Sequence, residues 1–162
     1  MNCSQSWNTL GLDQQKDILV LMFASFEKPW TDSLLTMVSE RFRIHDAQVS
    51  YYDTFDSPTH KAYSIWWMNE HFVYLDKMFV VPECKRHGLG SEWFRTWTRM
   101  LTPLPVVLRT SEFIASGFYA KLDMHIIAIN NDQVYMTNHP SFVSASMVNS
   151  LFSLPSCFTQ VP

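Results

Sequence analysis

Glycine is scarce in this sequence: Gly11, Gly88, Gly90 and Gly117 are the only four among 162 residues. A Walker A phosphate loop needs a glycine five positions before a second glycine and a lysine, and these four cannot form that pattern. The dinucleotide-binding fingerprint also fails, because Trp93 occupies the place of its third glycine, which must be small for close helix and strand packing. Both common glycine-rich nucleotide motifs are therefore excluded.

Cysteine is also scarce, and long apolar runs are missing. Cys3, Cys84 and Cys157 are far apart and form no C-x-x-C pair, so neither a zinc site nor a disulfide framework is indicated and no metal is expected. The only apolar run near the N-terminus, residues 18–23, is too short for a signal-peptide core or a membrane span. We therefore expect a cytoplasmic protein in a reducing compartment, with no membrane partner.

Charged residues make up only 17% of the chain and apolar residues 47%, which is typical of a globular protein with a sizeable core. The net charge of −3 is unevenly distributed: residues 1–76 carry five basic and ten acidic groups, whereas residues 77–109 carry six and two. This positive middle segment suits a polyphosphate ligand, although a solvated charged surface would look the same. It is too narrow to indicate nucleic acid binding.

Hydrophobic periodicity predicts alternating helices and strands in one domain. Helices are expected at residues 12–26, from about 32 to 42, at 89–101 and at 112–122, and strands at 48–55, 62–68, 72–81, 105–109, 125–129 and 134–137. The order is ααβββαβαββ. Residues 1–140 are predicted to form the domain, and residues 141–162 a C-terminal extension with a short helix or partial disorder.

The segment between the strand ending at Val81 and the helix starting at Leu89 carries the main functional signal. It reads Val-Val-Pro-Glu-Cys-Lys-Arg-His-Gly-Leu-Gly over residues 80–90. Glycines let successive backbone N–H groups approach one anion, and the start of the following helix adds unpaired N–H donors and a positive dipole. Lys85 and Arg86 add positive charge.

This V-x-P-x-x-K-x-x-G-x-G pattern resembles the central motif of the GNAT superfamily of acyl-CoA N-acetyltransferases. Lys85 stands where the family usually has Gln or Arg. The resemblance implies an α/β (α+β) fold with a mixed, mostly antiparallel twisted sheet of about six to seven strands flanked by about four helices. It also implies acetyl-CoA as acyl donor. The implied cofactor-binding residues are Phe79, Val80, Val81, Lys85, Arg86, His87, Gly88, Leu89, Gly90 and Ser91.

A second segment, residues 112–124, resembles the family's N-x-x-A-x-x-x-Y-x-K-x-G-F signature. Ala115, Tyr119 and Lys121 match in register, while Glu112 replaces Asn and Asp123 replaces the glycine that ends the helix. The family's tyrosine donates a proton to the departing CoA thiolate, so Tyr119 is the predicted general acid. Without the preceding loop, Tyr119 would be interpreted as a packing residue.

The remaining catalytic tasks fall on the strand before the loop. Asp76 is the candidate general base, either directly or through water, although it would equally suit a salt bridge with a neighbouring strand. The resemblance implies that a backbone N–H at about residues 79–81 stabilises the negative charge on the thioester oxygen. Cys84 and His87 have the spacing of a nucleophile pair or half a metal site, but no third partner supports either reading.

A narrower resemblance concerns the acceptor. Tyr-Leu-Asp-Lys-Met-Phe-Val at residues 74–80 and Leu-Arg-Thr-Ser at residues 108–111 resemble strands of the acetyltransferase domain of N-acetylglutamate synthases. This resemblance implies that Lys77 and Arg109 hold substrate carboxylates. Lys77 could instead point to solvent, and Arg109 could pair with Glu112 or with a CoA phosphate.

The expected function is transfer of an acetyl group from acetyl-CoA to a primary amine of a small molecule such as an amino acid. A protein or peptide N-acetyltransferase would suit the acidic first 76 residues. A non-catalytic GNAT-like module that binds acyl-CoA or a protein partner is favoured by the altered Glu112 and Asp123. A homodimer is compatible with all three readings.

Overall fold

The computed structural model describes residues 4–53 and 60–154 of the chain. Its strands are β1 Ser4–Ser6, β2 Gln48–Asp53, β3 His60–Met68, β4 Val73–Val80, β5 Val106–Ser111, β6 His125–Asn130 and β7 Gln133–Thr137. Its α-helices are α1 Leu12–Ser25, α2 Asp32–Ile44, α3 Leu89–Leu101 and α4 Glu112–Gly117. Short 3-10 helices are η1 Trp7–Thr9, η2 Pro82–Cys84, η3 Tyr119–Leu122 and η4 Ala145–Ser153.

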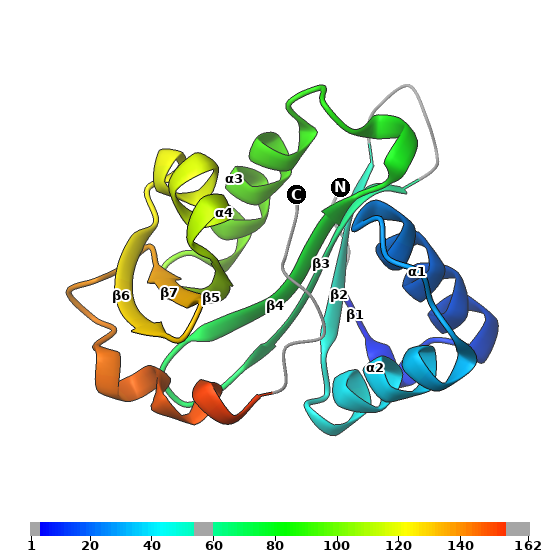
Figure 1. Ribbon diagram of the computed structural model, residues 1–162, viewed down its shortest axis with the longest axis horizontal. Helices are drawn as coiled ribbons and strands as arrows, with labels where there is room; N and C mark the ends of the chain where they lie inside the picture. Colours follow the sequence, from blue (N-terminus) through cyan, green and yellow to red (C-terminus); the bar gives the residue numbers. More distant parts are fainter. Residues whose placement is uncertain (1–3, 54–59, 155–162) are drawn as a thin grey trace.

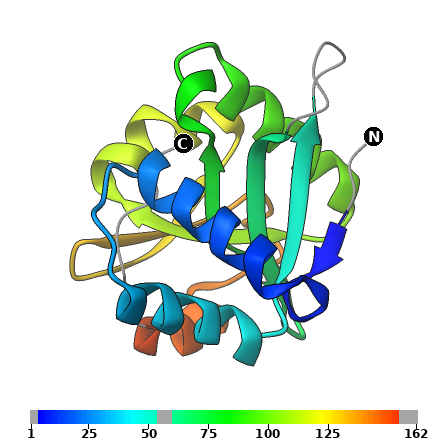
Figure 2. The same cartoon turned by 90° about the vertical axis from the view of Figure 1, so that its right-hand side faces the viewer.

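The seven strands form one mixed sheet in the order β1-β2-β3-β4-β5-β7-β6. Only β4 and β5 run parallel, and every other neighbouring pair is antiparallel. Helices α1 and α2 cover one face, and α3 and α4 cover the other (Figure 1). Figure 2 shows α1 crossing the sheet obliquely, with α2 beside its lower end. The predicted fold class, an α/β fold with a mostly antiparallel sheet and four helices, is confirmed.

Each helix turns an apolar side to the sheet, as its sequence spacing predicts. From α3, Trp93, Phe94 and Trp97 are buried against the strands. Helix α2 begins at Asp32 because Thr31 caps it: its hydroxyl oxygen accepts a hydrogen bond from the Leu34 backbone N–H. The two helix layers therefore enclose two apolar cores, one on each face of the sheet.

Three elements differ from the sequence-based expectation. The helix predicted over residues 112–122 is interrupted, because α4 ends at Gly117 and η3 follows, with Phe118 at φ −128° between them. Strand β1 and helix η1 were missed, since three-residue polar elements carry no periodic signal. Met100, near the end of α3, is 44% exposed although it is apolar. The last two residues of the strand predicted at 48–55, Thr54 and Phe55, lie outside the described residues.

The segment after residue 140 joins the core up to Leu154. Its predicted short helix is present as the 3-10 helix η4, and Val143, Val148 and Leu151 are buried with the core on the α1 and α2 face. Residues 155–162 lie outside the described part. Residues on both sides of the predicted boundary at residue 140 therefore pack into the same core.

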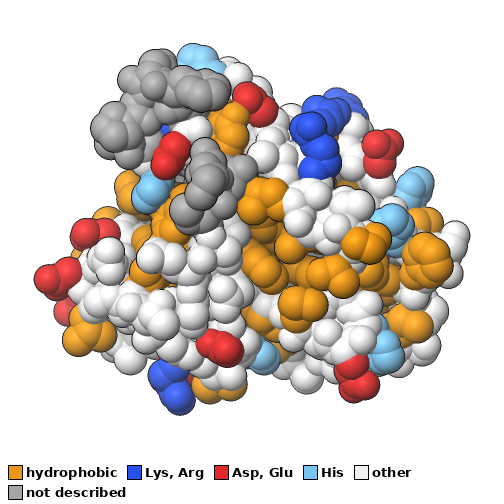
Figure 3. Space-filling model, turned by 180° about the vertical axis from the view of Figure 1, so that it is seen from behind, with side chains coloured by type: hydrophobic (Ala, Val, Ile, Leu, Met, Phe, Trp, Pro, Cys, Tyr) orange, Lys and Arg blue, Asp and Glu red, His pale blue; other side chains and the backbone are white. Residues whose placement is uncertain are grey.

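Edge strand β6 and its surroundings present apolar side chains to solvent. Ile126 is 54% and Ile129 67% exposed on β6, and Phe113 on α4 is 81% exposed. Viewed from behind, hydrophobic side chains gather across the middle of the molecule and toward the side that carries β6 (Figure 3). No helix within residues 4–53 and 60–154 is long and apolar enough to cross a membrane.

Candidate active site

The two central strands pair only over their first halves. The pairs between β4 and β5 are Val73 with Val106, Tyr74 with Val107, and Leu75 with Leu108. On the other side of β4 the register then shifts, because Leu75 pairs with Trp66 whereas Lys77 pairs with Ile65. Asp76 is therefore the extra residue of a β-bulge, which bends its strand. Figure 1 shows β4 and β5 diverging as they run toward the loop before α3.

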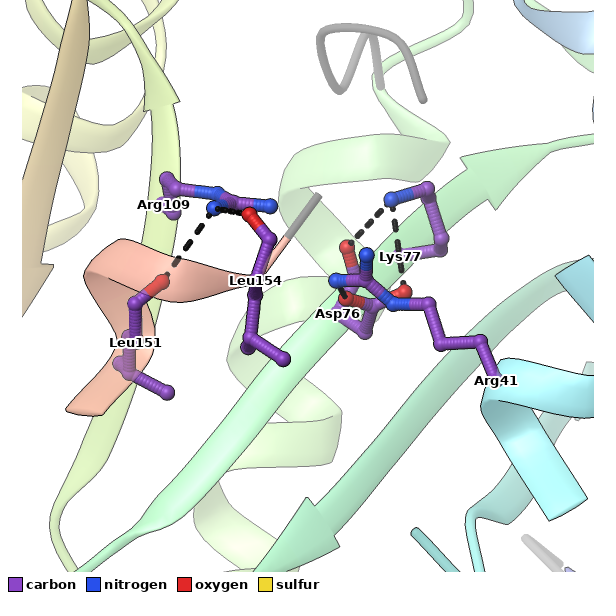
Figure 4. A network of polar contacts seen from close by, with 6 residues as sticks. All are labelled: Arg41, Asp76, Lys77, Arg109, Leu151 and Leu154. Carbon is purple, nitrogen blue, oxygen red and sulfur yellow. Dashed lines mark hydrogen bonds and ion pairs between the residues drawn. The ribbon is translucent and has the colours of Figure 1, made fainter. Parts of the chain in front are cut away.

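The bulge carries two buried charged side chains. Asp76 is 1% and Lys77 4% exposed. Arg41 of α2 forms an ion pair with Asp76 Oδ1, and Lys77 Nζ lies 3.4 Å from Asp76 Oδ2 (Figure 4). The alternative that Lys77 points to solvent is therefore wrong.

Opposing effects set the pKa of Asp76. Burial alone raises it, but the charges of Lys77 and Arg41 and their hydrogen bonds outweigh burial and hold the pKa below its usual value. Asp76 is consequently an ionised carboxylate stabilised by two cations, one from α2 and one from the next residue. Its role as general base stays a prediction, and this geometry works against direct proton transfer to it.

Arg109 lies on β5, one residue beyond the last pair with β4. It is 7% exposed, and its Nη1 donates hydrogen bonds to the carbonyl oxygens of Leu154 at 2.7 Å and Leu151 at 3.4 Å (Figure 4). Burial raises the pKa of Tyr74, and the charges of Asp76, Arg109 and Arg41 also act on it. Tyr74 lies in the paired part of β4, opposite Val107 of β5, close enough to these three charges for each to act on its pKa.

The predicted cofactor loop lines a cavity of about 200 Å³ at the end of β4. Seven of its nine lining residues are among those predicted: Val80, Lys85, Arg86, Gly88, Leu89, Gly90 and Ser91. The other two are Cys84 and Phe118. Phe118 was missed because it occupies a variable position of the second motif. Phe79 and Val81 are buried in the core instead, and His87 does not line the cavity.

Gly88 has the backbone conformation that the loop requires. It caps α3 with φ at 76°, a left-handed conformation that costs a residue with a Cβ about 1 to 2 kcal/mol. No other atom lies within 4 Å of the position that its Cβ would occupy. Arg86, at φ 66°, is also left-handed. The loop therefore has two left-handed residues, Arg86 and Gly88, shortly before the first turn of α3.

Lys85 turns toward α1 rather than straight into the cavity. Its Nζ donates a hydrogen bond to the carbonyl oxygen of Ser25, the last residue of α1. Burial lowers the pKa of Lys85, an effect that the charge of Glu27 opposes and that of Arg86 reinforces. Lys85 thus satisfies one of the unpaired carbonyls at a helix C-terminus, where positive charge is favourable.

The backbone of Val80 is the donor that the geometry favours for an oxyanion. The Val81 N–H is already bonded to the Lys61 carbonyl of β3 at 2.9 Å. Because successive residues of a strand turn their N–H groups to opposite sides, the Val80 N–H turns away from β3, toward the side on which β5 diverges. Val80 also lines the cavity.

Tyr119 is fully buried on the α3 side of the sheet. Its ring contacts Phe94 edge-on at 5.3 Å and Phe118 at 4.9 Å between ring centroids. Burial raises the pKa of Tyr119, so the phenol holds its proton at neutral pH. Asp123 ends η3 in the left-handed conformation at φ 62°, as expected for the residue that replaces glycine there.

A larger groove of about 520 Å³ lies between α1 and α2. It is open to solvent and lined by Lys16, Asp32 and Glu40 among others, but by none of the predicted site residues. The divergence of β4 and β5 is therefore the better candidate site, because it combines the bulge, the buried charges and the loop. Within residues 4–53 and 60–154, no three His, Cys, Asp or Glu side chains form a group that would hold a metal ion.

Neither a known protein-family model nor a curated protein sequence matches this chain. Solved structures do match. ElaA of Escherichia coli superposes with a TM-score of 0.60 at 16% identity, covering 85% of this chain and 98% of ElaA. The ribosomal-protein-S18-alanine N-acetyltransferase of the same organism gives 0.60 at 15% identity, covering 85% and 92%.

The PaiA N-acetyltransferase of Thermoplasma acidophilum, solved in complex with coenzyme A, gives a TM-score of 0.56 at 9% identity, covering 85% of this chain and 98% of that one. A Desulfovibrio desulfuricans protein assigned to the GNAT family of acetyltransferases gives a TM-score of 0.57 at 13% identity, covering 85% of this chain and 98% of that one. The chain therefore has the GNAT fold, as the loop motif predicted.

Proposed function

We propose that this protein is an acyl-CoA-dependent N-acetyltransferase that transfers the acetyl group of acetyl-CoA to a primary amine. The observation that carries this proposal is the cavity of about 200 Å³ at the end of β4, because seven predicted loop residues line it. Two of the matched neighbours, PaiA and an aminoglycoside 6'-N-acetyltransferase, were solved with coenzyme A. The proposed activity is supported by the site residues of this chain and by the likeness to these structures together.

Each part of the site has a task in this reaction. Acetyl-CoA supplies the activated acyl group. The backbone N–H groups of the loop and of the first turn of α3 bind its pyrophosphate, with Arg86 adding charge. The Val80 N–H stabilises the negative charge that grows on the carbonyl oxygen as the amine attacks. Tyr119, a phenol that burial keeps well protonated at neutral pH, donates a proton to the leaving sulfur. The proton that the amine nitrogen loses on acylation goes to water, and water returns a proton to the Tyr119 oxygen.

The acceptor is an amine that carries a carboxylate, such as an amino acid. Lys77 on β4 and Arg109 on β5 are buried cations, 4% and 7% exposed. Ammonium and guanidinium groups both form charge-assisted hydrogen bonds with carboxylates, so a substrate carboxylate between β4 and β5 would suit both side chains.

Cofactor binding is tested by calorimetric titration and by thermal unfolding with acetyl-CoA, CoA and ATP. Acetyl-CoA and CoA should raise the melting temperature by linkage, and ATP should not. Gly88→Val should abolish the shift because Gly88 is left-handed and lines the cavity. Gly11→Ala is the matched control, since its added Cβ would lie at ordinary distance, 3.7 Å from Gln14 Oε1. A wild-type protein that binds no CoA species would refute the proposed function.

The acceptor is tested by a screen for CoA release with amino acids, polyamines, aminoglycosides and short peptides. Glutamate and other amino acids should react, and polyamines should not. Arg109→Ala should raise the acceptor KM far more than the acetyl-CoA KM, since losing a partner of a bound carboxylate costs about 2 to 5 kcal/mol. Arg99→Ala, on the exposed side of α3, is the control.

Other outcomes of the screen point to other functions. Preference for basic peptides would favour a peptide N-acetyltransferase with its acceptor groove in the acidic first third. CoA binding without turnover of any amine would favour the non-catalytic module.

A further inference from the structure

Ser25, the last residue of α1, contacts the cofactor loop at two points, its first residue Val80 and Lys85 in its middle. It is fully buried, and its hydroxyl donates a hydrogen bond to the Val80 carbonyl at 2.7 Å. Its own carbonyl accepts the hydrogen bond from Lys85 Nζ. One residue, 55 positions before Val80 in the chain, therefore holds the end of β4 and the middle of the loop at once.

These contacts fix the last peptide unit of β4 from both sides. The unit that joins Val80 to Val81 has its N–H bonded to Lys61 of β3 at 2.9 Å and its carbonyl bonded to Ser25. With both polar groups held, the unit cannot rotate without breaking a buried hydrogen bond, which leaves an unsatisfied group at a cost of about 1 to 3 kcal/mol. The direction of the neighbouring Val80 N–H is set by the same constraint.

We propose that Ser25 is a positioning residue for acyl-CoA: through the Val80 carbonyl and Lys85 it holds the strand end and the loop in the geometry that receives the thioester and pyrophosphate. This inference rests on the proposed function. Neither sequence motif includes α1, so the role follows from the packing of α1 beneath β4. Phe26, the next residue, contacts Phe79 of β4 at 6.3 Å between ring centroids and keeps the helix end in place.

The test compares Ser25→Ala with Ser50→Ala. Ser50 is also fully buried, and its hydroxyl accepts one long-range hydrogen bond, from Trp66 Nε1 at 2.9 Å, but it lies on β2 away from the loop. Both variants lose one buried hydrogen bond and should lower the melting temperature. Only Ser25→Ala should weaken CoA binding, by about tenfold in Kd, and raise the acetyl-CoA KM while leaving the acceptor KM nearly unchanged. Ser25→Thr, which keeps the hydroxyl, should restore most of the affinity.

A ligand-free measurement separates this inference from the proposed function. Hydrogen exchange of the amides at residues 81–91 should be faster in Ser25→Ala than in wild type and unchanged in Ser50→Ala, whether or not CoA binds. Unchanged exchange in Ser25→Ala overturns the inference, as does an equal loss of CoA affinity in both alanine variants. Faster exchange in Ser25→Ala, found for a protein that binds no CoA, would overturn the proposed function and the acyl-CoA role of Ser25. It would still support the structural part of the inference, that Ser25 holds the end of β4 and the loop through hydrogen bonds.

Discussion

At the scale of single residues, burial decides what the candidate catalytic groups are able to do. Tyr119 and Asp76 are both buried, but their surroundings differ. Tyr119 lies among aromatic rings, so burial keeps its phenol protonated and suited to donating a proton. Asp76 lies between two cations, so its carboxylate stays ionised and is poorly suited to accepting a proton.

Replacing Tyr119 with Phe tests the proton-donor role. The variant keeps the ring that packs against Phe94 and loses only the hydroxyl. We expect turnover to fall by roughly ten to a thousandfold, as for loss of a general acid, with acetyl-CoA affinity nearly unchanged. Steady-state kinetics and calorimetric titration measure the two quantities. Equal turnover in wild type and Y119F would show that Tyr119 only packs.

Lys85 and Arg86 are adjacent, but the structure separates their roles. Lys85 is bonded to the end of α1, whereas Arg86 lines the cavity without that tether. The Kd for CoA should therefore lose part of its salt dependence in Arg86→Gln, because screening acts on charges that face the ligand. In Lys85→Gln the Kd should rise, but its salt dependence should match wild type. Titrations at low and high NaCl check this, and a flattened salt dependence in Lys85→Gln would contradict it.

At the scale of elements, α2 is the helix that brings charge and aromatic stacking to the bulge of β4. Arg41 in its last turn pairs with Asp76 and lies over the Trp67 ring at 5.9 Å. His45, which caps the helix, stacks on the same Trp67 at 4.3 Å between nearly parallel rings. Burial and the charge of Arg41 lower the pKa of His45.

The lowered pKa of His45 predicts a pH dependence of stability. The unfolded chain, in which the histidine has an ordinary pKa near 6.5, binds more protons than the folded protein below that value. The contribution of His45 is thus fully present above about pH 6.5 and is lost as the pH falls toward its folded pKa. His45→Phe keeps the stacking and removes the titration, so its melting temperature should fall less than that of wild type between pH 7.5 and pH 5. His71→Gln, in an exposed turn, should behave as wild type, and an equal fall in all three would contradict the assignment.

At the scale of the whole molecule, residues that follow the last strand, β7, contribute apolar side chains to the core. Val143, Val148 and Leu151 pack into the core beside α1 and α2, and Arg109 is bonded to the end of η4. The C-terminal part is therefore continuous with the candidate substrate site.

Truncation tests this dependence. A chain ending at residue 140 loses the burial of three apolar side chains, which should lower the free energy of unfolding by about 5 kcal/mol, a large part of the 5 to 15 kcal/mol that typical domains possess. A chain ending at residue 154 keeps them and should unfold near the wild-type denaturant midpoint. Urea unfolding measures both. Equal stability of the two truncated chains would show that the segment after residue 140 adds nothing to the core.

The elements and the loop were predictable because they depend on local patterns. Helical spacing placed α3 at Leu89–Leu101, and short apolar runs bounded by turn residues placed strands β6 and β7. The phosphate-type loop was visible because glycine conformation and helix N-termini are properties of neighbouring residues. These features identified the fold and most of the cavity lining.

Contacts between distant segments were decided only by the tertiary structure. Register shifts such as the bulge at Asp76 leave no mark in one strand, since they depend on the partner strand. Likewise, Ser25, Arg41 and Leu154 reach the site from α1, α2 and the chain beyond η4, at sequence separations of 35 to 55 residues. Sequence therefore determined which groups this protein has for the proposed acyl-CoA site. Packing decided which of them are buried, paired and charged where the strands part, because burial and Coulomb interactions depend on distance in space and not on distance along the chain.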